Sequence, residues 1–447
     1  MKKILSILLF LVVVCQIRAE DANITTMRKM TQRLFPQHAS SFDFRLLNNT
    51  SADTFTIKNE GNKIIISGNN ANSMAVGLNH YLKNYCLTTI SWYKDDPIEL
   101  PNTLPFISTE VTIKANVPTR FFLNYCTFGY SMTWWKWSDW EHFIDWMALN
   151  GINMPLAITG QEAIWYKVWS KLGLTDEEIR GYFTGPAHLP WHRMCNLDGW
   201  QSPLPKEWLS SQAALQEQIV AREREFNMRP VLPAFAGHVP TALKRVYPNI
   251  KTTRVSEWGG FADQYRCTFL NPMDSLYAII QKEYLTEQTR LYGTNHIYGI
   301  DPFNEIDPPS WDADSLGMMA KHFYESVAAV DPEAVWLQMT WLFYADIKHW
   351  TTPRIKSYLR SVPQDRLILL DYFCEYTEIW KQTDSYFGQP YLWCYLGNFG
   401  GNSFLSGPVN LVSERLADAL KNGGSNLKGV GSTLEGIDLN QFLYDFV

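Results

Sequence analysis

The sequence predicts an α/β protein in which a small α+β domain precedes a (β/α)8-type barrel. Two observations support this prediction. From about residue 116 onward, apolar strands alternate with amphipathic helices, and eight such strands can be counted. Before that point the strands come as a group, followed by one helix. With 447 residues, 46% of them hydrophobic, the chain is long enough to build more than one domain.

The composition disfavours a nucleic-acid partner. The formal net charge is -6 and no basic block occurs, so the electrostatic footprint of phosphate binding is missing. The chain also contains 18 Trp and 22 Tyr. Flat aromatic side chains suit the apolar faces of sugar rings, although we expect most of them to pack in the core.

Residues 1–19 are typical of a secretory signal, with two lysines, an apolar run over residues 4–14 and a cleavage site after Ala19. The run is too short for a permanent membrane span. We therefore expect a secreted or periplasmic protein. Cys15 resembles the lipidated cysteine of a lipoprotein box, but Val14 is bulkier than the small residue usual before it, so export without an anchor is favoured.

The first domain is expected over residues 20–115. Two of its strands are joined across Glu60 and Gly61, a helix follows from residue 71, and a proline-rich stretch near residue 100 marks the approach to a boundary. The predicted strands are "FDFRLL", "TFTIKN" and "KIIISG", and the predicted helix is "ANSMAVGLNHYLKNYC".

The second domain is expected over residues 116–447. Capping boxes at Ser138 with Glu141 and at Thr175 with Glu178 predict helix starts, and a long helix is expected over residues 206–228. The eight predicted strands are "RFFLNY", "NMPLAI", "RPVLPAFA", "HIYGIDPF", "AVWLQMT", "RLILLDYF", "PYLWCYL" and "LKGVGSTLE".

In a barrel of this type, polar residues at the carboxyl ends of the strands are the ones placed for chemistry. The rim predicted by this rule is rich in acid, amide and aromatic groups. Read in order, the strand ends carry Asn124, Cys126 and Tyr130; Gln161 and Glu162; His238; Asn304 and Glu305; Trp341; Asp371 and Glu375; Asn398 and Asn402; and Glu435.

Two glutamates on different strand ends match the needs of glycosidic bond cleavage, in which one carboxylic acid protonates the leaving oxygen and one carboxylate acts on the anomeric carbon. A single glutamate at a strand end is more often solvated or ion-paired than catalytic. Prolines on both sides of Glu305 in "IDPFNEIDPP" stiffen its turn, which favours the catalytic reading. An acid role also requires Glu305 to be partly desolvated. Glu435 in "STLEGI" is less distinctive, because Gly436 could merely permit a tight turn.

Other polar residues are ambiguous. His238 in "AFAGHVP" could orient a substrate hydroxyl or serve as a structural hydrogen-bonding residue. The six cysteines after the signal form no CxxC pair, and His188, His192 and Glu162 lack metal-ligand spacing. We therefore expect no metal site and no cofactor.

Several motifs together resemble the α-N-acetylglucosaminidases of glycoside hydrolase family 89, from about residue 20 to the end. They are "LNYCTFGYSMTWWKW", "NMPLAITGQEAIW", "VLPAFAGHVP", "DPFNEIDPP", "LWCYLGNFGGN" and "LEGI". The resemblance implies retaining hydrolysis of terminal α-linked N-acetylglucosamine, with Glu305 as acid/base and Glu435 as nucleophile. It also implies that the sugar pocket is shaped by Asn124, Cys126, Tyr130, Trp191, Trp258, Asn304 and Trp341.

The chain departs from the family pattern in two respects. It ends at "NQFLYDFV", so we expect the family's helical C-terminal domain to be absent and the last barrel helix to be truncated. Asp263 stands where the partner of Cys267 would align in a local cysteine pair of the animal enzyme. The start of the chain is bacterial in character. Two further hypotheses stay open, a barrel that binds glycans without cleaving them and a glycosidase for another terminal sugar, and the oligomeric state is not predicted.

Overall fold

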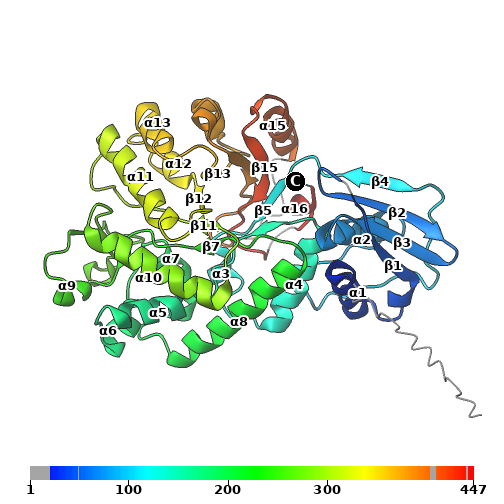
Figure 1. Cartoon of the computed structure of the whole chain (residues 1–447), viewed down its shortest axis with the longest axis horizontal. Helices are drawn as coiled ribbons and strands as arrows, with labels where there is room; N and C mark the ends of the chain where they lie inside the picture. The colour runs from blue at the N-terminus through cyan, green and yellow to red at the C-terminus, as the bar shows by residue number, and fades with distance from the viewer. Residues whose placement is uncertain (1–20, 49, 403–408, 439–440, 447) are drawn as a thin grey trace, which may run out of the picture.

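The computed structural model describes residues 21–48, 50–402, 409–438 and 441–446, which form a small domain and a barrel (Figure 1). The predicted signal and Cys15 lie outside the described residues. Across the described part of the chain, no helix combines the length and apolarity that crossing a membrane requires.

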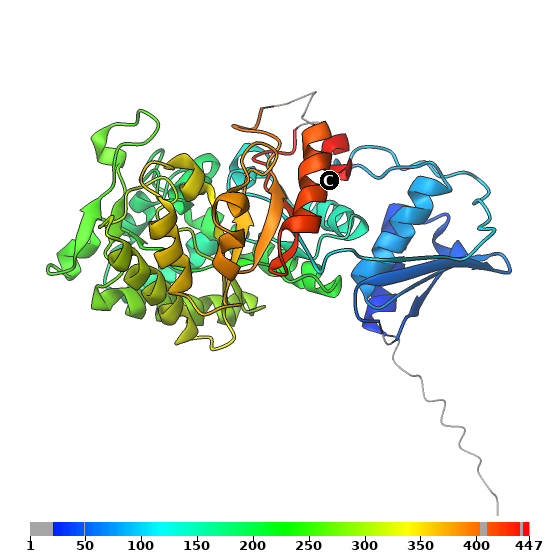
Figure 2. The same cartoon turned by 90° about the horizontal axis from the view of Figure 1, so that it is seen from above.

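The small domain is a four-stranded mixed sheet in the order β1-β3-β2-β4, with two helices on one face (Figure 2). The predicted hairpin at Glu60 and Gly61 is confirmed, because Gly61 adopts a φ of 60° and the strands on either side pair antiparallel. Helix α2 starts where the Asn70 side chain accepts the Ser73 N–H at 2.8 Å. The elements are α1 (Ala22–Leu34), β1 (Phe42–Leu46), β2 (Thr54–Glu60), β3 (Lys63–Gly68), α2 (Ala71–Asn84) and β4 (Val111–Lys114).

All eight predicted barrel strands are confirmed, and they form one parallel sheet in the order β6-β5-β15-β14-β13-β12-β11-β7. The two outer strands meet at a parallel bridge between Leu156 and Val231, where the Val231 N–H donates to the Pro155 carbonyl at 2.8 Å. The sheet therefore curls onto itself. The strands are β5 (Thr119–Phe122), β6 (Met154–Pro155), β7 (Leu232–Pro233), β11 (Ile297–Gly299), β12 (Val335–Met339), β13 (Leu367–Asp371), β14 (Tyr391–Tyr395) and β15 (Leu427–Ser432).

Helices surround the barrel (Figure 1). The capping box at Thr175 and Glu178 is confirmed, with N–H to oxygen distances of 2.8 and 3.2 Å. The box predicted at Ser138 and Glu141 is wrong: the Lys136 N–H donates to Asp139 at 2.8 Å, so the helix begins two residues earlier. The longer helices are α4 (Trp137–Leu149), α5 (Gln161–Lys171), α8 (Lys206–Glu225), α10 (Ser275–Tyr292), α11 (Ala313–Ala328), α13 (Thr352–Arg360) and α15 (Val409–Asn422). The shorter ones are α3 (Thr127–Tyr130), α6 (Asp176–Tyr182), α7 (Leu189–Arg193), α9 (Leu243–Val246), α12 (Trp341–Ala345), α14 (Ile379–Gln382) and α16 (Gln441–Phe446).

Between β7 and α10 the chain leaves the barrel and forms a second small sheet in the order β8-β10-β9. Its strands are β8 (His238–Val239), β9 (Thr252–Arg254) and β10 (Thr268–Leu270), all antiparallel to their neighbours. This sheet was not expected, because strands of two or three residues show no readable periodicity. It carries a long loop between β9 and β10 toward the carboxyl ends of the barrel strands.

A buried ion network joins the two domains. Asp145 on α4 accepts hydrogen bonds at 2.8 Å both from Arg33 on α1 and from Arg222 on α8. Asn72 and Asn79 on α2 add hydrogen bonds to the backbone carbonyls at the end of α4, at 2.8 and 2.9 Å. A buried carboxylate such as Asp145 is costly without a partner, so loss of Arg33 or Arg222 would be destabilising. Because Arg33 comes from the small domain and Arg222 from a barrel helix, these contacts hold the two domains together.

Candidate active site

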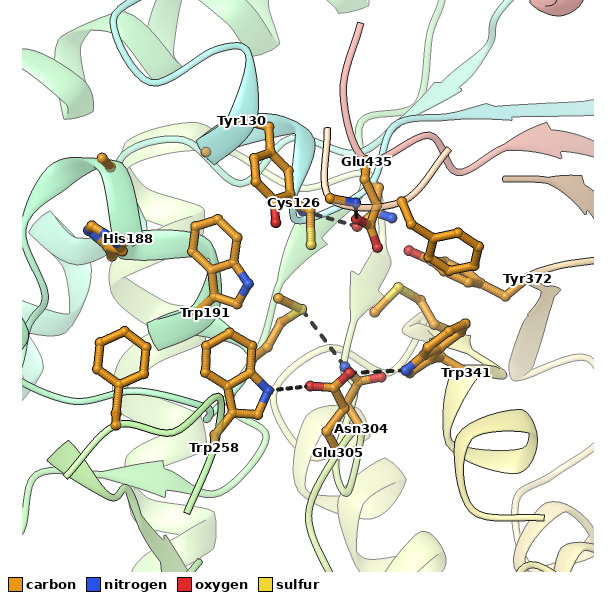
Figure 3. A pocket seen from close by; sticks show the side chains of 18 residues that line it. Cys126, Tyr130, His188, Trp191, Trp258, Asn304, Glu305, Trp341, Tyr372 and Glu435 are labelled. Carbon is orange, nitrogen blue, oxygen red and sulfur yellow. Dashed lines mark hydrogen bonds between the residues drawn. The ribbon is translucent and has the colours of Figure 1, made fainter. Parts of the chain in front are cut away.

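A cavity of about 640 Å³ opens at the carboxyl ends of the barrel strands (Figure 3). Its walls combine two glutamates, two asparagines and many aromatic side chains. They come from Asn124, Cys126, Gly129, Tyr130, Ala187, His188, Trp191, Met194, Trp258, Phe261, Asn304, Glu305, Met339, Trp341, Tyr372, Phe399, Gly400 and Glu435.

Glu435 follows β15 and is half-buried in the cavity wall. Its backbone N–H donates to Asn398 Oδ1 at 3.1 Å, and its carboxylate accepts the Gly400 N–H. Burial raises the pKa of Glu435, the Gly400 N–H opposes that shift, and the charge of Glu305 adds to it. The carboxyl group is therefore held by a backbone N–H, and the backbone of Glu435 is held by an amide side chain.

Asn124, at the end of β5, locks this wall to the neighbouring strand. Its Nδ2 donates to the Thr433 carbonyl at 2.8 Å, and its Oδ1 accepts the Cys126 N–H at 3.0 Å. Thr127 Oγ1 reaches the Leu434 carbonyl at 2.6 Å. The two residues before Glu435 are thus fixed by side chains from the first barrel strand.

The turn after β11 presents Asn304 and Glu305. Phe303 adopts a φ of 62°, a left-handed conformation that is uncommon for a bulky residue. Asp301 is half-buried and accepts the Met339 N–H at 2.7 Å, which ties the turn to β12. The prolines around Glu305 predicted a stiff turn, and the structure shows a constrained backbone there.

Glu305 is held by three side-chain donors from three other segments. Oε2 accepts Trp258 Nε1 at 2.7 Å and Asn196 Nδ2 at 3.1 Å, and Oε1 accepts Trp341 Nε1 at 3.2 Å. Figure 3 shows the carboxyl groups of Glu305 and Glu435 on opposite sides of the cavity, both turned into it. Glu305 is solvent-exposed, so the partial desolvation expected from the sequence is not provided by the described residues.

Aromatic rings line two sides of the cavity. Tyr130 meets Trp191 edge to face with ring centroids 5.1 Å apart, and Trp191 lies 6.4 Å from Trp258. Opposite them, Trp341 contacts Tyr372 and Phe399, with centroids 6.0 and 5.9 Å apart. Such walls offer flat apolar surface to a ring-shaped ligand, while the polar groups sit between them.

Nine of the ten predicted site residues line the cavity, and His238 does not. The structure puts His238 on β8 rather than at the end of a barrel strand, where its Nε2 lies 2.7 Å from Asp198 Oδ1. The nine that converge are Asn124, Cys126, Tyr130, Trp191, Trp258, Asn304, Glu305, Trp341 and Glu435.

Other acids at strand ends have structural contacts. Glu162 is buried and pairs with Arg193 at 2.8 Å, Asp371 accepts the Trp380 N–H at 2.9 Å, and Glu375 accepts the Gly397 N–H at 2.7 Å. The strand-end rule therefore selects candidate acids. Only the structure distinguishes Glu305 and Glu435, which face the cavity, from the acids with structural contacts.

The sequence analysis missed several cavity residues. Asn196 donates to Glu305 from 109 positions away, and nothing in its local sequence marks it. Tyr372 follows β13 directly, so the strand-end rule could have found it. The remaining missed residues lie on connections or are apolar or glycine: Gly129, Ala187, His188, Met194, Phe261, Met339, Phe399 and Gly400.

Comparison with known proteins identifies the family. Residues 120–447 match the model of the α-N-acetylglucosaminidase TIM-barrel domain, and residues 25–106 match that of the N-terminal domain of the same family. The chain belongs to the α-N-acetylglucosaminidase family. The N-terminal match ends before β4 and the barrel match begins within β5, so the last strand of the small sheet lies between the two matched regions.

Individual proteins are similar to the chain over most of its length. The human α-N-acetylglucosaminidase is 42% identical over 88% of this chain and 53% of its own length. A family 89 glycoside hydrolase from Clostridium perfringens, solved with 2-acetamido-1,2-dideoxynojirmycin, superimposes with a TM-score of 0.87 at 27% identity, over 95% of this chain and 48% of its own. The chain thus spans about half the length of these relatives.

A second structure of the clostridial enzyme bears on the site. It is a variant in which two glutamates are replaced by glutamine, in complex with its substrate GlcNAc-α-1,4-galactose. It superimposes with a TM-score of 0.87 at 27% identity, over 95% of this chain and 47% of its own.

Proposed function

We propose that this chain is a retaining exo-glycosidase that removes terminal, non-reducing α-linked N-acetylglucosamine from glycans. The observation that carries the proposal is the pair Glu305 and Glu435, which come from different strand ends and face each other across one aromatic-walled cavity. Two carboxyl groups flanking a sugar-sized space are the machinery of glycoside hydrolysis. The membership of the chain in the α-N-acetylglucosaminidase family supports the choice of sugar.

In the first step, a carboxylate oxygen of Glu435 attacks the anomeric carbon from the β face while Glu305 donates its proton to the glycosidic oxygen. The bond between the anomeric carbon and that oxygen breaks, and the aglycone leaves as an alcohol. The Gly400 N–H donates to the Glu435 carboxylate, and the Asn398 amide oxygen holds the backbone of Glu435. The product of this step is a β-glycosyl ester of Glu435.

In the second step, Glu305, now a carboxylate, takes a proton from water. The resulting nucleophile attacks the anomeric carbon from the α face and releases Glu435, so the freed sugar is the α-anomer. Trp258, Trp341 and Asn196 hold the Glu305 carboxylate during this step, because all three donate to it. Asn304, next to Glu305, is placed to hydrogen-bond a substituent beside the reacting carbon.

The test is hydrolysis of an aryl α-N-acetylglucosaminide by the purified protein, with NMR identifying the anomer of the sugar released first. Initial release of the α-anomer supports the proposal, and initial release of the β-anomer contradicts the double displacement. A panel of aryl glycosides of other sugars tests the sugar preference. Sugar binding without turnover would favour a glycan-binding barrel instead.

We also propose that residues 1–19 direct export, without lipidation of Cys15. The support is the pattern of charge and apolar run in the sequence. Mass spectrometry of the protein from its native host should find a mature chain that starts after Ala19. A chain starting at a lipid-modified Cys15 would show anchoring, and an uncleaved start would contradict both.

A further inference from the structure

Behind the aromatic wall that carries Trp191 lies a buried cluster of sulfur, imidazole and carboxylate groups. It consists of Cys195, Cys267 and His238, together with Asp198 and His192. The ligand atoms of the two cysteines and His238 all lie within 4.8 Å of one another. The catalytic scheme uses none of these groups.

Asp198 joins the cluster through a single oxygen. Its Oδ1 lies 2.7 Å from His238 Nε2, 3.4 Å from Cys267 Sγ and 3.2 Å from His192 Nδ1. The aromatic rings of His192 and His238 are 4.7 Å apart at their centroids. Two sets of three ligand atoms, one with both cysteines and one with His192 and Asp198, therefore share His238 in a region that is shielded from solvent.

This arrangement matches the donor set of a structural zinc site. Zinc prefers four ligands in a tetrahedron, drawn from thiolates, imidazoles and carboxylates. With zinc-to-ligand distances of about 2.3 Å for sulfur and about 2.0 Å for oxygen, tetrahedral geometry puts sulfur and oxygen about 3.5 Å apart. The separation of Cys267 Sγ from Asp198 Oδ1 is 3.4 Å. The 2.7 Å between His238 Nε2 and Asp198 Oδ1 is a hydrogen-bond distance, so a bound ion would replace that hydrogen bond and move the two atoms to about 3.3 Å apart.

We propose that Cys195, Cys267, His238 and Asp198 bind one zinc-type divalent ion, with His192 orienting Asp198 by hydrogen bonding. The ion would balance the charge of the two thiolates, and burial would protect them from solvent. Sequence spacing predicts no metal because the ligands come from three separate segments, residues 195–198, β8 and the residue before β10. The proposal does not depend on which sugar the cavity accepts.

The position of the cluster suggests what the ion does. Residues facing the cavity and residues facing the cluster alternate along one segment: Trp191 and Met194 line the cavity, whereas Cys195 and Asp198 face the cluster. Asn196, between the last two, donates to Glu305. On the other side, Cys267 ends the loop that carries Trp258. A bound ion would cross-link two of the three segments that hold Glu305 in place.

The main experiment measures metal in the purified wild-type protein, prepared without chelator, by mass spectrometry, and then replaces the metal with cobalt(II). One zinc per chain and a sulfur-to-cobalt charge-transfer band in the near ultraviolet would support the proposal. Both measurements use the wild-type fold, so they remain decisive if a variant fails to fold. Absence of zinc together with absence of that band after cobalt addition would overturn it.

Two variants sharpen the result. Cys267→Ser should lose the charge-transfer band and the rise in melting temperature on zinc addition, whereas Cys86→Ser, a buried cysteine in the small domain, should keep both. The alternative use of the two thiols is a disulfide. A peptide map that finds Cys195 linked to Cys267 in protein purified without reductant would also overturn the metal site.

Discussion

The two sides of the cavity are built in different ways. On the side of β5 and β15, Glu435 is half-buried and its surroundings are fixed by hydrogen bonds to backbone groups of adjacent strands. On the side of β11, Glu305 is exposed, and side chains from three distant segments hold its carboxylate. One wall is part of the barrel, and the other is assembled from its connections.

The difference teaches that the two carboxyl groups depend on different parts of the sequence. Backbone contacts between neighbouring strands follow from the barrel itself, so the Glu435 wall forms as soon as the sheet closes. The Glu305 wall needs the loop before β10, the segment after α7 and the start of α12 to be in register at the same time. We therefore expect mutations on the two sides to separate stability from activity.

The largest effect is expected from removing either carboxyl group. Glu435→Ala and Glu305→Ala should each lower kcat by about 10²–10⁴-fold or more, because each removes a group that acts in the transition state. Azide distinguishes the roles. Azide should rescue Glu435→Ala and give a β-glycosyl azide. It should rescue Glu305→Ala and give an α-glycosyl azide. The reverse pairing, read by NMR, would exchange the two assignments.

The next largest effect concerns the wall made of connections. Trp258→Phe removes the 2.7 Å donor to Glu305 while keeping an aromatic ring, and a hydrogen bond to a charged group is worth about 1.5–3 kcal/mol. We expect kcat to fall by about 10- to 100-fold with little change in melting temperature. Trp341→Phe is the matched variant, and its longer 3.2 Å bond should give a smaller loss. Equal losses would show that ring packing, not the N–H, determines the effect.

On the barrel side, stability should change instead. Asn124→Ala leaves the Thr433 carbonyl and the Cys126 N–H buried without their partner, at a cost of about 1–3 kcal/mol in the free energy of unfolding. Asn84→Ala, at an exposed helix end, is the control and should change stability by no more than about 0.5 kcal/mol. Urea unfolding measures both. An Asn124→Ala protein with an unchanged free energy of unfolding would mean that the Asn124 hydrogen bonds do not stabilise the strand ends.

The same contrast explains how far the sequence alone could lead. The eight strands were predicted because each is an apolar run with a clear boundary, and the strand-end rule then picked out Asn124, Asn304 and both glutamates. Asn196 could not be found, since its contact with Glu305 depends on how a long connection folds. His238 was misplaced because it was taken as the residue at the end of the third barrel strand, whereas it begins the separate strand β8.

Trp191 and Trp258 were assigned to the pocket from family resemblance alone, whereas Trp341 was also found by the strand-end rule. The physical reason is that Trp is equally suited to a core and to a sugar platform, so composition cannot choose between them. The tryptophans of "WWKW" illustrate this: Trp135 packs against Trp140 with ring centroids 5.3 Å apart, and none of the run lines the cavity.

The smallest effect expected concerns pH and stability on the barrel side. Burial raises the pKa of Glu435 in the folded protein, so between the unfolded and folded pKa values the folded state binds more protons than the unfolded state. Stability due to this group is therefore complete below its unfolded pKa and falls as pH rises through the folded pKa. Glu435→Gln carries no such charge, so its melting temperature relative to wild type should increase with pH and level off once Glu435 is fully ionised.

Melting curves over a pH series measure this difference, and Glu305→Gln serves as the comparison on the exposed wall. A difference between Glu435→Gln and wild type that stays constant with pH would mean that the Gly400 N–H fully offsets the cost of burying the carboxylate.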